Sequence, residues 1–193
     1  MRRALLIAGG VAAAALVLLH VPLVARSLGG CPFGYDKPIA TAVHGAPQPA
    51  LGFALDATTG AQIRAWATAH AIACTPHRGA LECAQVPASL LGEAGLATTS
   101  AWFALDGSDT LRAIHTVRRT RDPQVVAAAF DAAEMGATRA LGTPVVTAGD
   151  PTTLADGALR QAMAEHRTPH LSITLRATNM GDGYALTESY AVN

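Results

Sequence analysis

The sequence predicts an α+β domain, in which an antiparallel sheet carries about two helices packed on one face, after an apolar N-terminal segment. Strand-like segments occur in pairs joined by short turn-forming sequences. Two amphipathic helical patterns lie between these strands. Strands and helices do not alternate regularly, as a parallel sheet would require, so the sheet is expected to be antiparallel.

The first part of the domain is predicted to hold one strand and one helix. Residues 51–55, LGFAL, have the composition of a short strand. Residues 56–59 offer several N-cap side chains, so a helix is expected over about 60–71. One face of this helix carries Ile63, Trp66, Ala67 and His70. We expect Trp66 to anchor the helix to the sheet.

The middle of the domain is predicted to hold a strand pair and a longer helix. Residues 102–105 and 111–117 are strand-like, and the DGSD sequence between them is typical of a turn. A helix is expected over 122–141, because Asp can cap its start and the following GTP sequence stops it. Its apolar face consists of Val126, Phe130, Ala133, Ala137 and Leu141. Residues 155–166 are ambiguous, since propensity favours helix and position favours strand.

The last segment has the clearest pattern, that of a half-buried antiparallel hairpin. Apolar and polar residues alternate over 171–178, and NMGDG at 179–183 turns the chain into a second strand that ends at residue 192. Matching the two apolar faces pairs Ala177 with Tyr184, and the same register pairs Ile173 with Glu188.

Residues 4–25 form an apolar segment long enough to cross a membrane. As a helix, these residues extend about 33 Å, against about 30 Å for a bilayer's hydrocarbon core. Arg2 and Arg3 precede the segment, so the positive-inside rule keeps the N-terminus in the cytoplasm. We therefore expect a single-pass protein of the bacterial cell membrane, with its C-terminal domain outside the cytoplasm, facing the periplasm or the exterior.

Three processing outcomes remain open for the N-terminus. Residues 1–30 either stay as a signal anchor, are removed as an ordinary signal peptide, or end in a lipobox, LGGC, whose Cys31 is lipidated. Arg26 and the proline after the cysteine disfavour lipidation. Residues 31–50, rich in proline, glycine and alanine, are predicted to be a linker, and residues 51–193 the exported domain.

Composition and charge exclude two classes of protein. Half of the 193 residues are apolar and only 15% are charged, which excludes an intrinsically disordered chain. Three of the 14 basic residues precede residue 31, so residues 31–193 hold 11 basic and 14 acidic side chains. No basic stripe is available for a nucleic-acid backbone, so nucleic acid is not an expected partner. Arginine outnumbers lysine 13 to one, as is typical of a GC-rich bacterial genome.

The three cysteines are exported by the predicted topology into a compartment where disulfides persist. Eight residues separate Cys74 from Cys83, and a proline and an Arg-Gly pair between them favour a turn, so we predict that these two are bridged. The alternative, redox catalysis, normally uses a Cys-x-x-Cys sequence, which is absent. Cys31 is then lipidated, free near the membrane, or bridged to a second chain.

Four motifs, CPFGYD, LGFALDATTGAQIRAW, the two cysteines eight residues apart and TNMGDGYALTESY, occur in this order. In this respect the chain resembles a group of uncharacterised bacterial membrane-anchored envelope proteins. The plan of a Thr-capped helix followed by hairpins is also similar to that of small envelope-assembly lipoproteins. These resemblances imply an envelope location and carry over neither an activity nor a functional residue.

The histidines are interpreted as structural. His166 and His170 have the H-x-x-x-H spacing of a zinc-binding helix, but an intervening proline breaks such a helix. We therefore predict that both are solvated loop residues. His70 and His115 are predicted to be partly buried and hydrogen-bonded.

The other polar motifs are more typical of turns than of catalysis. Asp106 and Asp109 flank a turn glycine, where Asp usually bonds the local backbone. The two glycines around Asp182 favour a hairpin turn over a calcium loop. No serine lies in a G-x-S-x-G sequence, and no phosphate-binding loop is present. The sequence therefore predicts no metal, no cofactor and no catalytic nucleophile.

Glu188 is the candidate functional acid. The predicted strand places it on a face with Tyr184, Leu186 and Tyr190, so its carboxylate is either paired by an arginine or has a raised pKa. The expected partners are Arg112, Arg118 and Arg119, and a structural ion pair is favoured over acid catalysis.

Two functions follow from these predictions. The first is a membrane-anchored, non-catalytic module that binds a protein partner or a small ligand in the envelope. The second is an exported enzyme, most naturally a hydrolase, with unrecognised catalytic residues. A deep pocket joining Glu188 with a His or an Arg favours the enzyme. A shallow apolar patch or an open sheet edge favours the binding module.

Overall fold

The computed structural model describes residues 45, 47–91 and 96–193. The predicted membrane segment 4–25 and Cys31 lie outside the described residues, as does most of the predicted linker. Within the described part of the chain, no helix is long and apolar enough to cross a membrane.

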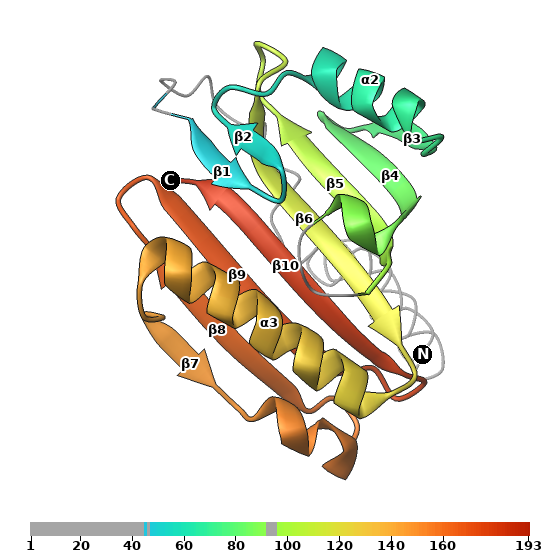
Figure 1. Ribbon diagram of the computed structural model, residues 1–193, viewed down its shortest axis with the longest axis vertical. Helices are drawn as coiled ribbons and strands as arrows, with labels where there is room; N and C mark the ends of the chain where they lie inside the picture. The colour runs from blue at the N-terminus through green and yellow to red at the C-terminus, as the bar shows by residue number, and fades with distance from the viewer. Residues whose placement is uncertain (1–44, 46, 92–95) are drawn as a thin grey trace, which may run out of the picture. The chain divides into compact units, whose positions relative to one another are not determined.

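An eight-stranded antiparallel sheet forms the centre of the fold (Figure 1). Its strands lie in the order β3–β4–β5–β6–β10–β9–β8–β7. Their bounds are β3 (Cys74–His77), β4 (Ala80–Val86), β5 (Thr98–Leu105), β6 (Leu111–Thr120), β7 (Val146–Ala148), β8 (Gln161–Arg167), β9 (Leu171–Asn179) and β10 (Tyr184–Val192). The predicted α+β class and antiparallel sheet are thus confirmed.

The other elements of the described residues are two α-helices, a small hairpin and two 3-10 helices. Their bounds are β1 (Gln48–Ala50), β2 (Phe53–Leu55), α2 (Gly60–Ala69), η1 (Ala88–Leu90), α3 (Pro123–Leu141) and η2 (Pro151–Asp156). Thr59 caps α2 in a capping box with Gln62, and Asp122 caps α3 ahead of a proline in its first turn. Both predicted helix starts are therefore confirmed.

The sheet consists of two similar halves. Helix α2 is followed by the meander β3–β4–β5–β6, and helix α3 by the meander β7–β8–β9–β10. The last strand of each half pairs with the other, with Thr116 of β6 opposite Glu188 of β10. The two halves therefore join at the centre of the sheet.

Both helices cover the same face of the sheet. The register aligns Phe103, Ile114, Tyr190 and Ile173 across neighbouring strands, so these side chains share one face. Helix α2 contacts this row through Trp66, whose ring lies edge-on to Phe103 at a centroid distance of 6.0 Å. Helix α3 packs against β8, β9 and β10 on the same side.

The segment predicted as one strand over 51–55 is a strand only over Phe53–Leu55, and its first two residues form the turn of a hairpin. Leu51 and Gly52 both have positive φ angles, 48° and 84°, and turn the chain between β1 and β2. The prediction was wrong because a glycine inside a strand-like run marks a turn here. Strand β1 also begins at Gln48, inside the segment predicted as linker.

The C-terminal hairpin has the predicted faces but a different register. Tyr184 pairs with Asn179, and Glu188 pairs with Leu175, a shift of two residues from the prediction. The reason is that Asn179 belongs to β9, since its side-chain oxygen accepts from the Gly181 N–H and tightens the turn. A two-residue shift keeps every side chain on its predicted face.

The ambiguous segment 155–166 contains the end of η2 and most of β8. Alternate residues of β8 are buried, among them Ala162, Ala164 and His166. Sheet pairing with β9 therefore outweighs the helix propensity of this sequence.

Candidate functional site

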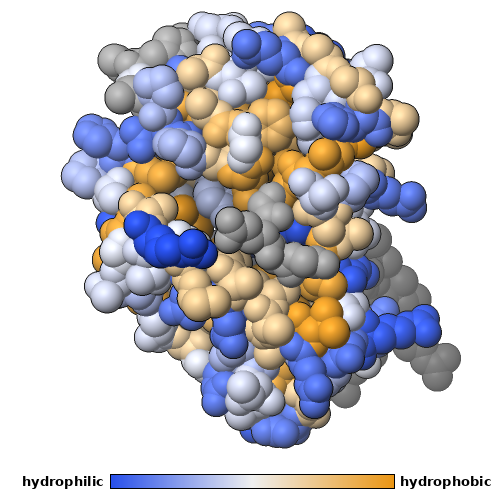
Figure 2. Space-filling model, in the orientation of Figure 1, coloured by the Kyte–Doolittle hydropathy of each residue, from blue (hydrophilic) through white to orange (hydrophobic). Residues whose placement is uncertain are grey.

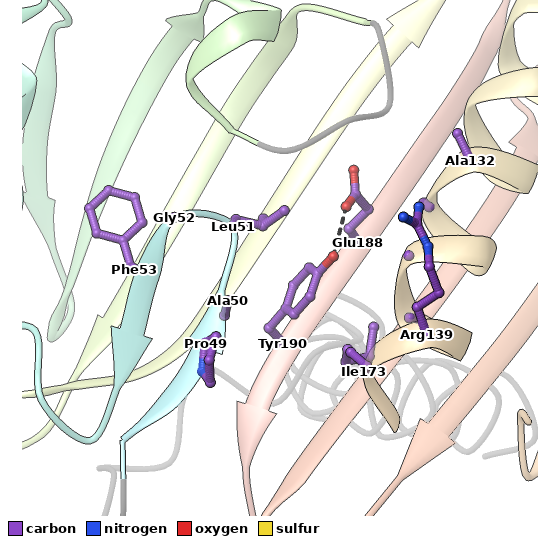
Figure 3. A pocket seen from close by; sticks show the side chains of 14 residues that line it. Pro49, Ala50, Leu51, Gly52, Phe53, Ala132, Arg139, Ile173, Glu188 and Tyr190 are labelled. Atoms are coloured by element: carbon purple, nitrogen blue, oxygen red, sulfur yellow. Dashed lines mark hydrogen bonds between the residues drawn. The ribbon is translucent and has the colours of Figure 1, made fainter. Parts of the chain in front are cut away.

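A groove of about 620 Å³ lies between the β1–β2 hairpin and helix α3 (Figure 3). Its floor is formed by β9 and β10 through Ile173, Glu188 and Tyr190. The hairpin wall consists of Pro49, Ala50, Leu51, Gly52 and Phe53, and the helix wall of Ala132, Ala133, Gly136, Ala137, Arg139 and Ala140. Most of the lining is thus apolar. Figure 2 shows apolar residues gathered at the centre of this side of the molecule, over α3 and beside it.

The helix wall of the groove carries small side chains that lie on one face of α3. Ala132, Gly136 and Ala140 recur every four residues and therefore lie along one stripe of the helix. A Cβ atom built on Gly136 meets no atom within 4 Å, so this stripe faces open space. A surface of this kind lets another backbone or helix approach closely.

The floor of the groove holds a buried ion pair. Arg118 donates its Nε hydrogen to Glu188 Oε1 at 2.7 Å, and the Tyr190 hydroxyl donates to Glu188 Oε2 at 3.1 Å (Figure 3 shows the second bond). Arg118 is completely buried and Glu188 is 2% exposed. Each carboxylate oxygen therefore already accepts a hydrogen bond from a neighbouring side chain.

The guanidinium of Arg118 also binds two backbone carbonyls. Its Nη1 donates to Leu96 O at 2.6 Å, and its Nη2 donates to Leu91 O. These two carbonyls flank residues 92–95. One side chain on β6 thus ties the β4–β5 connection to β10 through Glu188.

Burial dominates the electrostatics of this site. It raises the pKa of the Glu188 carboxyl, while the charge of Arg118 and the bonds from Tyr190 and Arg118 oppose this shift. Burial, followed by the charge of Glu188, also raises the pKa of Tyr190, so its hydroxyl keeps its proton. The phenol can therefore donate to Glu188 and still accept a hydrogen bond from the groove.

Of the three arginines expected near Glu188, only Arg118 pairs with it. Arg112 forms an ion pair with Asp56, and both side chains are almost fully buried. Arg119 is exposed, because it alternates with Arg118 along β6 and lies on the opposite face of the sheet. The predicted structural ion pair of Glu188 is present.

The predicted disulfide between Cys74 and Cys83 is present. The two residues lie directly opposite each other on β3 and β4. The bridge is therefore a cross-strand link at one edge of the sheet, and it lies away from the groove lining.

The four histidines considered in the sequence analysis differ in burial. His166 is fully buried on β8 and not solvated as predicted, because strand alternation turns it inward, where its Nδ1 lies 2.9 Å from Gly142 O at the end of α3. His170 lies exposed in the β8–β9 turn. His115 is half-buried, as predicted, and its Nδ1 lies 2.8 Å from the Ser189 hydroxyl.

His70 was predicted to be partly buried but is exposed. It is the C-cap residue of α2, which ends at Ala69, two residues earlier than expected. Its ring remains 5.7 Å from that of Trp66.

The carboxylates of Asp106 and Asp109 act in the local structure, as predicted. Asp106 Oδ1 accepts from the backbone N–H groups of Ser108 and Thr110. Asp109 Oδ2 accepts from Ala61 N–H at the start of α2 and from Arg64. These bonds fix the β5–β6 turn against the helix.

Neither the groove nor the role of Tyr190 was predicted from the sequence. The groove depends on the hairpin β1–β2, which was read as a single strand. The regular spacing of small residues on α3 was a signal for it, but alanine is common throughout the chain.

Among the described residues, no group of three His, Cys, Asp or Glu side chains is arranged to hold a metal ion. No family model, curated protein or solved structure matches the chain. The groove is therefore the feature of the described residues from which a function is inferred.

Proposed function

We propose that this protein is a membrane-anchored, exported, non-catalytic module that binds an apolar helical segment of another envelope protein. The binding site is the groove between the β1–β2 hairpin and α3. The observation that carries this proposal is the apolar lining of the groove above a carboxylate that is already bonded to Arg118 and Tyr190.

The lining favours burial of an apolar ligand. Among its residues, only Arg139, Glu188 and Tyr190 bear polar side chains. Ligand sites with a mostly apolar lining gain affinity from area removed from water, while a few polar groups set orientation. We expect Tyr190 to set orientation here, by accepting one hydrogen bond.

The two walls favour a helix over an added strand. Pro49 occupies the middle of β1 and cannot donate a backbone hydrogen bond to an incoming strand. The small residues at four-residue spacing on α3 let the ridge of a second helix pack closely. We therefore infer that the ligand is an amphipathic helix whose apolar face enters the groove.

The enzyme alternative requires Glu188 to act as an acid or base. In that role the carboxyl would have to exchange its bond to Arg118 or Tyr190 for one to a substrate. Glu188→Gln removes proton transfer and keeps the shape of the floor, but it also removes the anionic partner of Arg118. Partner crosslinking from this variant is therefore compared with wild type under conditions in which thermal unfolding shows both to be folded. A binding module should retain its partner in this variant.

Photo-crosslinking in cells tests the proposal. A benzophenone amino acid is placed at Leu51 or Ala132 in the groove, and at the exposed Ala84 of β4 as the matched control. Both groove positions should give the same adduct, mapped by mass spectrometry to one amphipathic helical segment. Adducts that are the same from Ala84 as from the groove would contradict the proposal.

A further inference from the structure

A second surface lies at the end of the sheet where β9 turns into β10 (Figure 1). Leu159, in the connection that enters β8, is 74% exposed, and Met180, in the β9–β10 turn, is 46% exposed. Apolar side chains exposed beside basic residues are a feature of surfaces that contact membranes. We call Leu159 and Met180, with Arg119, Arg121 and Arg160, the sheet tip.

A buried side chain holds the two apolar residues in place. Asn179 is 9% exposed, and its Nδ2 donates to Leu154 O at 2.9 Å and Gly157 O at 3.0 Å. Its Oδ1 accepts from Gly181 N–H at 2.8 Å. One amide side chain therefore fixes both the connection before β8 and the turn that carries Met180.

Backbone hydrogen bonds strengthen this arrangement. Leu159 N–H donates to Asn179 O, and Asn179 N–H donates to Arg160 O, each at 2.9 Å. Leu159 adopts a φ of 63°, in a region that a branched residue such as leucine disfavours. Leu159 thus combines an exposed apolar side chain with a disfavoured backbone conformation, and such outliers cluster at functional surfaces.

Basic residues surround these apolar side chains. Arg119, Arg121 and Met180 line a cleft of about 260 Å³ together with Thr120, Asp182, Gly183 and Tyr184. The cleft lining thus contains two arginines and one acidic residue. Arg160 is exposed and directly follows Leu159. Elsewhere in the described residues, Arg64, Arg112, Arg118 and Arg167 are in ion pairs with carboxylates.

We infer that the sheet tip docks onto the anionic surface of the phospholipid bilayer. Leu159 and Met180 enter the interfacial region, and the arginines contact lipid phosphates. This inference rests on the proposed function only for the membrane anchor, which would keep the domain on a chain that is attached to a bilayer. The groove opens between the hairpin and α3 and shares no lining residue with the cleft. Tip docking and groove binding are therefore separable.

Site-specific fluorescence on the full-length chain in lipid vesicles tests the inference. Cys31 is first replaced by Ser, and a polarity-sensitive dye is attached at Leu159→Cys or Met180→Cys. Met135→Cys on α3, where the side chain is 59% exposed, is the matched control. Vesicles contain phosphatidylcholine alone or with phosphatidylglycerol, and a spin-labelled lipid quenches any dye that reaches the bilayer.

Dyes at 159 and 180 should be quenched in the anionic vesicles, and the dye at 135 should not. Arg119→Gln with Arg121→Gln should weaken docking by roughly 25-fold, at roughly fivefold per arginine. Asn179→Ala should reduce quenching at both positions together, because it releases both segments. Equal quenching at 135, 159 and 180, or none at 159 and 180, would overturn the inference.

An alkaline wash of the same vesicles reports the anchor separately. A chain that stays with the vesicles after the wash is anchored, whatever its tip does. If the wash removes the chain, the anchor prediction is wrong. In that case, quenching at 159 and 180 that still requires phosphatidylglycerol supports the tip inference, and quenching that does not require it overturns the inference.

Discussion

The Nε of Arg118 lies 2.7 Å from Oε1 of Glu188, and this bond joins β6 and β10, the last strands of the two halves of the sheet. Both side chains are buried on the face that the helices cover. Tyr190 on the neighbouring inward position of β10 donates to the same carboxylate and lines the groove. The ion pair therefore underlies both the centre of the sheet and the floor of the candidate site.

Loss of one partner of this ion pair should destabilise the domain strongly. Arg118→Met leaves Glu188 buried without its cation, at an expected cost of about 3–5 kcal/mol in the free energy of unfolding. The double variant Arg118→Met with Glu188→Leu should cost less, because no charge then remains buried. Urea unfolding of the full chain in detergent measures both. A single variant within about 1 kcal/mol of wild type would show that the pair is not structural.

Stability should fall in mild acid because of His115. Burial lowers the pKa of His115 from 6.5 to about 4, so the folded state disfavours the proton that the unfolded chain accepts. The stabilisation is complete above pH 6.5 and is lost as the pH falls from 6.5 towards 4. Its full value is about 3 kcal/mol, at about 1.4 kcal/mol per pKa unit.

His115→Gln is the control for this pH dependence, because it keeps a polar side chain beside Ser189 but does not titrate there. The difference in unfolding free energy between wild type and this variant should shrink as the pH falls through this range. Other titrating groups, Glu188 included, are present in both proteins and cancel in the difference. A difference that stays constant with pH would show that His115 titrates normally.

The disulfide should stabilise the domain without being needed for the groove. It closes a loop of about ten residues, for which chain entropy gives about 2–3 kcal/mol. Replacing Cys74 and Cys83 by Ser should lower the melting temperature and leave partner crosslinking from Leu51 unchanged. Thiol titration of the unfolded, unreduced chain should find neither cysteine free. Two reactive thiols from this pair would disprove the bridge.

The sequence was sufficient for the fold class, both helices and the disulfide, because each depends on local signals. Thr59 and Asp122 are strong N-caps, and Cys74 and Cys83 have a spacing that suits a hairpin. The local sequence does not determine the register of the last hairpin. A two-residue shift preserves the faces, so only the side chain of Asn179 distinguishes the two registers.

The candidate site depended on contacts between distant segments. Arg118 and Glu188 are 70 residues apart. The sheet turns Arg112 and Arg118 inward and Arg119 outward, and only the strand pairing places Arg118 rather than Arg112 beside Glu188. His166 was predicted to be a solvated loop residue, but alternation along β8 buries it. Contacts such as that between Arg118 and Glu188 depend on the order of the strands in the sheet. The local periodicity of the sequence does not reveal this order.

Gly136→Ala should stabilise the protein by about 1 kcal/mol, because alanine favours helix and the added Cβ meets no atom. Thermal unfolding measures this change. Gly52→Ala is the contrasting control, since the hairpin turn needs the φ of 84° at Gly52. This variant should be less stable than wild type. Destabilisation by Gly136→Ala would mean that the groove is filled at this point.

The central claim is that a helical partner segment binds in the groove. Its most direct test is to fill the groove and measure how much partner is captured. Gly136→Phe places a large side chain between α3 and the hairpin, where open space lies above the helix. The crosslink yield from Leu51 to the helical partner segment should fall at least tenfold, while the melting temperature stays close to that of Gly136→Ala. An undiminished yield with the groove filled would contradict the proposal that the partner binds there.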